Sequence, residues 1–105
     1  MDGPTDSDQT PLRYSNEEAR TVFRKAARTG AIVLTKHARK RMREYGVDNN
    51  DILSIARTGV ILIASELDIK TNEWAYRIES GGLHLKAVFT ILDPSRVRLL
   101  TVMTD

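Results

Sequence analysis

Residues 73–104 read EWAYRIESGGLHLKAVFTILDPSRVRLLTVMT, and this stretch decides the class of fold. Apolar and polar side chains alternate along 73–79 and again along 83–92, which is the pattern of strands that bury one face. The turn-forming triplets Ser-Gly-Gly and Asp-Pro-Ser separate these two strands from each other and from a last strand at 96–104. Because short turns join antiparallel neighbours, we expect an antiparallel meander.

The chain before this stretch has the period of helices. Apolar residues recur every three or four positions within 15–30, 36–45 and 48–59. Each segment begins at or directly after a residue whose side chain can cap a helix: Ser15, Thr35 and Asp48. In the middle segment the residues expected to be buried are Ala38, Met42 and Tyr45.

Two further segments are rich in apolar and β-branched residues. The first, at 31–34, is expected to be a brief buried strand or an extended connector. The second, at 60–66, is expected to be the first of four strands.

This order of elements predicts an α+β domain of two layers, with the N-terminal helices packed on one face of a four-stranded, mainly antiparallel sheet. In the strand at 73–79, the face toward the helices would carry Trp74 and Tyr76, because side chains two residues apart share a face. The opposite face of the sheet would display Arg77 and Lys86, close to where a substrate could lie.

One domain accounts for most of the chain. Its 105 residues are 41% hydrophobic and 29% charged, which fits a single core at 15–105 preceded by a flexible polar tail at 1–14. The absence of cysteine excludes disulfide scaffolds and thiolate metal sites, and no motif for a metal or a cofactor is present, so we expect neither. No apolar run is long enough for a membrane span, and we expect a cytoplasmic protein without membrane contact.

Basic residues are concentrated in one block. Between Arg20 and Arg43 there are nine lysines and arginines and no acidic residue, although the whole chain has a formal net charge of only +2. Like charges this dense oppose helix formation, and the usual compensation is a polyanion such as nucleic acid. We therefore expect a nucleic-acid surface made by residues of the block and one lysine of the sheet: Arg20, Arg24, Arg28, Lys36, Arg39, Lys40, Arg43 and Lys86. A solvated helix face and an acidic protein partner are the alternatives.

His37 lies inside this block and is the candidate for acid–base chemistry. A histidine among guanidinium groups suits metal-independent RNA cleavage, in which the 2′-hydroxyl attacks its own phosphate while a base removes the proton and cations stabilise the phosphorane. DNA lacks this internal nucleophile. The alternative for His37 is a structural role, with the ring packed at the helix start and bonded to a strand carbonyl. For Arg77 the alternative is a cross-strand ion pair.

The chain reads IVLTKHARKRM at 32–42, GV at 46–47 and LLTV at 99–102, with a predicted helix at 51–56 and Arg77 on a later strand. In these features it resembles an uncharacterised bacterial domain family of the RelE/ParE-like toxin superfamily, whose characteristic start is Thr-Lys/Arg-His-Ala-x-x-Arg-Met. The resemblance covers about residues 31–104, so the predicted helix at 15–30 is an addition to it.

The resemblance implies a small sheet with two packed helices and, commonly, an endonuclease that cuts free or ribosome-bound messenger RNA and is neutralised by an antitoxin encoded beside it. It also implies a catalytic set: His37 and Arg41 from the motif, and Arg77 from the later strand. Our leading hypothesis is therefore a toxin-like, metal-independent endoribonuclease without cofactors, with RNA and an antitoxin as partners. The alternative is a noncatalytic module that uses the same basic surface to bind nucleic acid or to inhibit a protein, as the gyrase-poisoning branch of the superfamily does.

Overall fold

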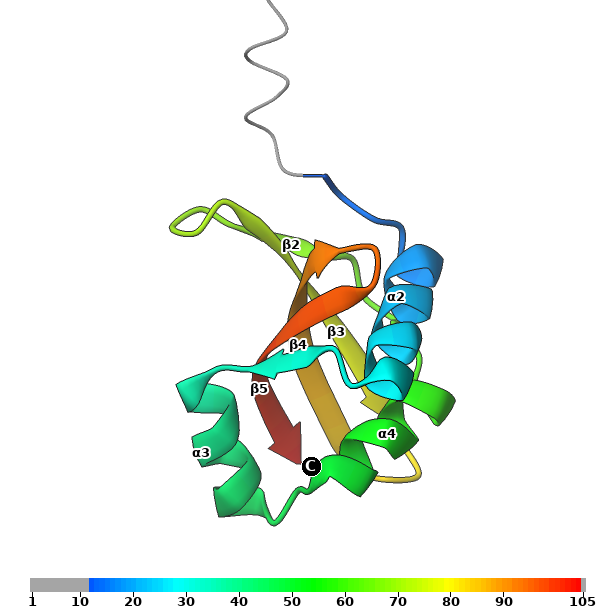
Figure 1. Cartoon of the computed structure of the whole chain (residues 1–105), viewed down its shortest axis with the longest axis vertical. Coiled ribbons are helices and arrows are strands. Elements are labelled where there is room, and N and C mark those ends of the chain that lie inside the picture. The colour runs from blue at the N-terminus through cyan, green and yellow to red at the C-terminus, as the bar shows by residue number, and fades with distance from the viewer. Residues whose placement is uncertain (1–11, 105) are drawn as a thin grey trace, which may run out of the picture.

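The computed structural model describes residues 12–104 and shows an α+β domain with three helices and a five-stranded mixed sheet (Figure 1). The helices are α2 (Asn16–Thr29), α3 (Lys36–Tyr45) and α4 (Asn49–Thr58). The strands are β1 (Ile32–Leu34), β2 (Glu66–Asp68), β3 (Glu73–Ser80), β4 (Leu85–Asp93) and β5 (Arg96–Thr104). The predicted α+β class is confirmed. The first eleven residues of the predicted tail, and Asp105, lie outside the described residues.

The helix caps predicted from the sequence are confirmed. At the start of α2, the Ser15 hydroxyl accepts the N–H of Glu18 at 3.1 Å, and the Glu18 carboxylate accepts the N–H of Ser15 at 2.9 Å. These bonds from the backbone and the hydroxyl of Ser15 hold the pKa of Glu18 below its usual value. The helix ends at Gly30, whose φ of 76° lies in the left-handed region. Asp48 and Asp51 form the same reciprocal pair at the start of α4.

The sheet has five strands where four were predicted, in the order β1-β5-β4-β3-β2. The segment at 31–34 supplies an edge strand, because β1 pairs in parallel with β5. Every other strand pairing in the described sheet is antiparallel, as expected for a meander. The strand predicted at 83–92 starts later, at Leu85, because His84 adopts a φ of 53° in the preceding turn.

The prediction of a strand over 60–66 is wrong for most of its length. Val60 makes one isolated bridge to β3, and regular pairing resumes only in β2. Between them, side-chain donors take the place of a neighbouring strand. The Asn16 amide nitrogen lies 3.5 Å from the carbonyl oxygen of Ile61 and 3.3 Å from that of Ile63. Backbone carbonyls that accept hydrogen bonds from a side chain do not need the hydrogen bonds of a neighbouring strand.

The core lies between α2, α4 and one face of the sheet. Phe23 of α2 packs on Phe89 of β4 with ring centroids 4.6 Å apart, and the centroid of Tyr76 of β3 lies 5.5 Å from that of Phe89. Burial raises the pKa of Tyr76, and its hydroxyl accepts the N–H of Tyr14 at 2.8 Å. The packed domain therefore begins before the predicted boundary at Ser15.

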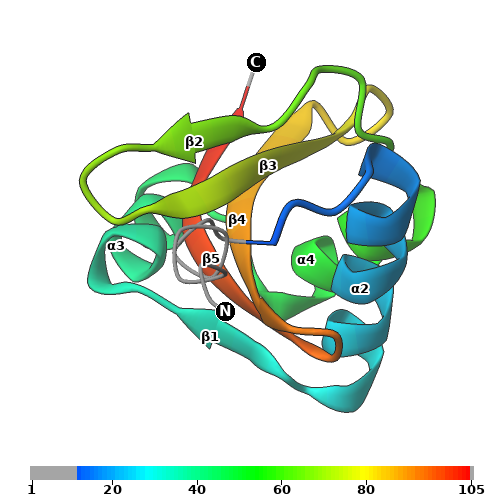
Figure 2. The same cartoon turned by 90° about the horizontal axis from the view of Figure 1, so that it is seen from above.

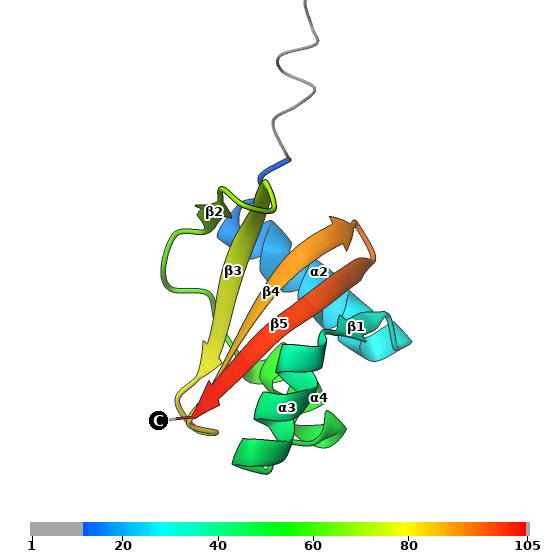
Figure 3. The same cartoon turned by 90° about the vertical axis from the view of Figure 1, so that its left-hand side faces the viewer.

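The prediction that all the helices pack on one face of the sheet is wrong. α2 packs against α4, whereas α3 packs against β5 and β1. In Figures 1 and 2, α3 lies on the other side of β5 from α2 and α4. Figure 3 shows α3 in front and α2 behind the strands. The reason is that β1 has only three residues, so α3 continues along the part of β5 that β1 leaves unpaired.

Gly59, at the end of α4, is required by close packing against β3. An added Cβ would lie 2.5 Å from the carbonyl oxygen of Ile55 and 2.8 Å from Cγ1 of Ile78. We predict that Gly59→Ala lowers the free energy of unfolding by about 1–3 kcal/mol, because these atoms must shift. Gly81→Ala is the matched control, since its Cβ would meet nothing within 4 Å, and it should change stability by less than about 0.5 kcal/mol. Urea unfolding measures both, and equal stabilities would contradict this packing.

Candidate nucleic-acid interface

The cap of α3 also binds the sheet. The Thr35 hydroxyl accepts the N–H of Ala38 at 3.0 Å, and it lies 3.1 Å from the carbonyl oxygen of Leu99 and 3.2 Å from that of Leu100. The Thr35 N–H donates to the same Leu99 carbonyl at 3.2 Å. The backbone and the side chain of one residue thus fix the first turn of α3 to β5, and this sets the position of His37.

The side of α3 that faces away from the core is basic. The helix buries Ala38 and Met42. Its exposed cations form the α3 basic surface: Lys36, Arg39, Lys40 and Arg43. None of the four has a hydrogen-bond or ion-pair partner within residues 12–104. Because the protein itself does not neutralise these charges in the described range, they are available to an anionic ligand.

His37 and Arg41 are in contact on one flank of this surface. Arg41 Nε lies 3.5 Å from His37 Nε2, and its N–H is directed at this ring nitrogen. Arg41 also donates through Nη1 to Glu44 at 3.1 Å and to the Tyr45 hydroxyl at 3.5 Å. The side chains of Arg41 and Glu44 are 40% and 42% exposed, which makes this a weak ion pair that a phosphate can displace.

Tyr45 is a member of this cluster that sequence reasoning missed. The helical period groups it with the buried residues Ala38 and Met42, but in the structure it is 41% exposed. Its ring centroid lies 6.0 Å from Cζ of Arg41. The signal in the sequence is the spacing of four residues between Arg41 and Tyr45, which places the two side chains one above the other on a helix.

Arg77 faces away from α2, because its neighbour Tyr76 faces the core and side chains alternate along β3. Its Nη2 lies 3.4 Å from Oε2 of Glu79, in the same strand rather than across strands. Its Nε is buried and has no hydrogen-bond partner among the described residues. A cavity of about 150 Å³ beside Arg77 has both apolar and polar walls, which include Ile63, Val88 and Glu66. Arg77 is therefore a half-buried cation with a single, long ion pair.

The structure does not bring Arg77 into contact with His37 and Arg41. No hydrogen bond or ion pair joins them in the described chain, and β4 and β5 lie between β3 and α3. Adjacent strands are ~4.8 Å apart, so roughly 10 Å separates β3 from β5. In Figure 2, α3 lies on the other side of β5 from α2. Because Arg77 also faces away from α2, a ligand that extends across β4 and β5 could reach both α3 and Arg77. Lys86 is on this side too, paired in register with Glu79.

Two arginines of the basic block act inside the protein. Arg20 Nε donates to the carbonyl oxygen of Gly59 at 2.9 Å. Arg24 donates through Nε to the carbonyl of Ala56 at 3.2 Å and through Nη2 to that of Arg57 at 3.4 Å. Carbonyls at a helix C-terminus lack helical partners and carry partial negative charge, so these guanidinium groups bind α2 to the end of α4. This role gives Arg20 and Arg24 an intramolecular explanation that needs no nucleic acid.

No family model, curated protein or solved structure matches the chain. The site must therefore be interpreted from its own geometry. Within residues 12–104, no helix is both long and apolar enough to cross a bilayer. In the same range, no three histidine or carboxylate side chains gather in a way that could hold a metal ion.

We predict opposite effects for two cations of the block. Arg24→Met should lower the free energy of unfolding by about 1–2 kcal/mol, because it leaves the carbonyls of Ala56 and Arg57 without this donor. Lys40→Met, on the exposed side of α3, should change it by less than about 0.5 kcal/mol. RNA affinity should fall more in Lys40→Met than in Arg24→Met. Chemical denaturation and fluorescence anisotropy measure the two quantities, and equal losses of stability would contradict the division of the block.

Proposed function

We propose that this chain is an RNA-binding domain of RelE-like fold that cleaves RNA without a metal ion. The observation that carries the proposal is the contact between His37 and Arg41, directly beside the α3 basic surface. One helix thus holds a proton acceptor, a phosphate ligand and a set of cations that are unpaired within the described chain.

The α3 basic surface binds the RNA backbone. Each phosphate that is neutralised releases counterions, so four cations on a helix of 10 residues favour a polyanion and make its affinity depend on salt. Without such a ligand, the same cations repel one another across single turns of the helix. RNA is favoured over DNA because the chemistry available to His37 needs a 2′-hydroxyl.

The cleavage step uses two residues of α3. When Arg41 turns from His37 to the phosphate, the lone pair of His37 Nε2 becomes free and takes the proton of the 2′-hydroxyl, and the 2′-oxygen attacks the adjacent phosphorus. The bond from phosphorus to the 5′-oxygen breaks, and the leaving oxygen takes up a proton from water. The products are a 2′,3′-cyclic phosphate and a 5′-hydroxyl. Arg41 exchanges Glu44 for the phosphate, where its guanidinium offsets the charge that develops. Arg77 binds a flanking phosphate across the sheet.

The connection of the elements supports the RelE-like fold. Two helices, α3 and α4, follow β1, and the last strand of the antiparallel meander returns to pair with β1. This order fits what the resemblance over residues 31–104 implies. The proposed setting is accordingly a cytoplasmic toxin–antitoxin system, with messenger RNA, free or on the ribosome, as substrate and an antitoxin protein as partner.

A noncatalytic role is the second candidate. Arg77 pairs with Glu79 and lies apart from His37, so the three residues of the implied catalytic set do not converge on one phosphate. In this case α3 binds nucleic acid or inhibits a protein, and nothing is cut.

We predict that His37→Ala lowers RNA cleavage roughly 10²- to 10⁴-fold, the loss expected for a positioned proton-transfer group, and changes RNA affinity little. The assay follows a labelled RNA oligonucleotide in the presence of a chelator and tests the products for 2′,3′-cyclic phosphate. His84→Asn is the matched control and should keep the full rate, because His84 is exposed in a turn and asparagine tolerates its φ of 53°.

The proposal is contradicted if folded His37→Ala protein cleaves at the original rate. Resistance of an RNA with a 2′-deoxy group at the cut position supports the internal nucleophile. RNA binding by the natural chain with no cleavage at all decides for the noncatalytic role.

A further inference from the structure

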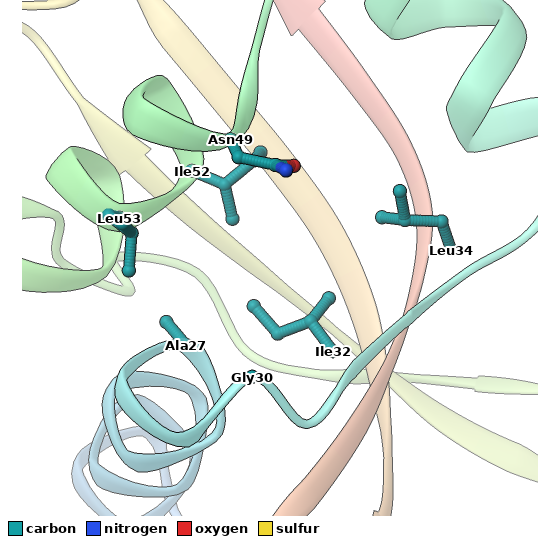
Figure 4. Close-up of a pocket in the computed structure, with 7 residues that line it drawn as sticks. All are labelled: Ala27, Gly30, Ile32, Leu34, Asn49, Ile52 and Leu53. Atoms are coloured by element: carbon teal, nitrogen blue, oxygen red, sulfur yellow. The ribbon is translucent and has the colours of Figure 1, made fainter.

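A second surface opens between the C-terminal end of α2, β1 and α4. A cavity of about 350 Å³ lies there, and its lining is mainly apolar. Figure 4 shows Ile32 and Leu34 of β1 and Ile52 of α4 pointing into the gap. The two β1 side chains are only half-buried.

The cavity continues toward three arginines. A neighbouring cavity of about 340 Å³ shares Ala27 and Leu53 with the first and is walled by Arg24, Arg28 and Arg57. Together they form one groove, the α2–α4 groove, which is apolar near β1 and basic at the other end. Among the described residues, no acidic side chain lines either part.

Two of the three arginines of this groove have side chains without partners in the described chain. Arg28 and Arg57 are exposed, and their guanidinium groups have no hydrogen-bond or ion-pair partner within the described residues. Leu53, where the two parts of the groove meet, is 40% exposed. Guanidinium groups bind carboxylates through two parallel hydrogen bonds, and an exposed leucine between apolar walls favours another apolar side chain. The groove is thus complementary to a segment that is both apolar and acidic.

We infer that the α2–α4 groove binds an acidic amphipathic helix of a second protein. On α4 the lining residues are 49, 52, 53, 56 and 57, which is the i, i+3, i+4, i+7, i+8 pattern of one helix face, so the groove runs along the helix axis. From Asn49 to Arg57 this is ~12 Å at 1.5 Å per residue, the length of about two helical turns. Apolar side chains of the partner helix fill the β1 end, and its carboxylates meet Arg28 and Arg57.

Two other occupants fit less well. RNA would place phosphates against the apolar walls made by Ile32 and Ile52, which offer no donor for them. Residues 1–11 of this chain carry three aspartates but no leucine, isoleucine, valine or phenylalanine that could fill the apolar end. The groove also depends on α2, which lies outside the α3 basic surface, so the inference does not rest on the proposed RNA cleavage.

The test uses the full chain and a fluorescein-labelled helical peptide of about four turns, with leucines at i, i+4 and i+7 and glutamates on the flanks. We expect saturable binding that weakens about tenfold or more in Leu53→Asp and in the double variant Arg28→Glu/Arg57→Glu. Leu62→Asp and the double variant Lys25→Glu/Lys70→Glu are the matched controls, because they change an exposed leucine and two exposed cations that do not line the groove, and they should bind as the natural chain does.

Several results would overturn the inference. These are equal binding by the groove variants and their controls, equal binding of a peptide with lysines in place of the glutamates, and displacement of the acidic peptide by a synthetic peptide of residues 1–11. Loss of RNA affinity in Arg28→Glu/Arg57→Glu without any peptide binding would assign the groove to RNA. The double variant changes two exposed side chains, so it keeps the test valid if Leu53→Asp does not fold.

Discussion

The arrangement of the candidate site depends on the hydroxyl of Thr35. This group caps α3 and meets carbonyls of Leu99 and Leu100, which lie 64 and 65 residues further along the chain. It therefore joins the first half of the chain to the last strand. Because β1 pairs in parallel with the same strand, the chain crosses from the side of α2 to the opposite side at one fixed point. The direction of α3, and with it the contact between His37 and Arg41, follows from this junction.

Residues of the basic block lie in three different environments in the fold. Arg20 and Arg24 bind carbonyls at the end of α4 and hold two helices together, so they contribute to stability. Arg28 lines the α2–α4 groove, where we propose that it binds a carboxylate. The four cations of the α3 basic surface face away from the core and have no partners in the described chain, so a phosphate backbone can lie there. A single compositional signal thus combines a structural role with the two binding roles that we propose.

Features set by neighbouring residues could be predicted from the sequence, and features set by distant residues could not. The capping box at Ser15 involves residues three apart, and its pattern is visible in the sequence. The parallel pairing of β1 with β5, and the donors that Asn16 provides to the segment after Val60, link residues far apart in the chain. For the site, the spacing within α3 indicated His37 and Arg41. Nothing in the sequence distinguishes an arginine that points at a carbonyl from one that points at solvent, so the bonds that Arg20 and Arg24 make to α4 could not be predicted.

The central claim is that the α3 basic surface, and not positive charge in general, binds RNA. It is tested most directly by the RNA affinity of the full chain with Lys36→Glu and Lys40→Glu, compared with the double variant Lys25→Glu and Lys70→Glu. Both double variants make the same change in net charge at exposed lysines, but the second pair lies on α2 and in the connection between β2 and β3. The first should lose roughly tenfold or more in affinity at physiological salt, while the second stays close to the natural chain. Equal losses in the two double variants would contradict the claim.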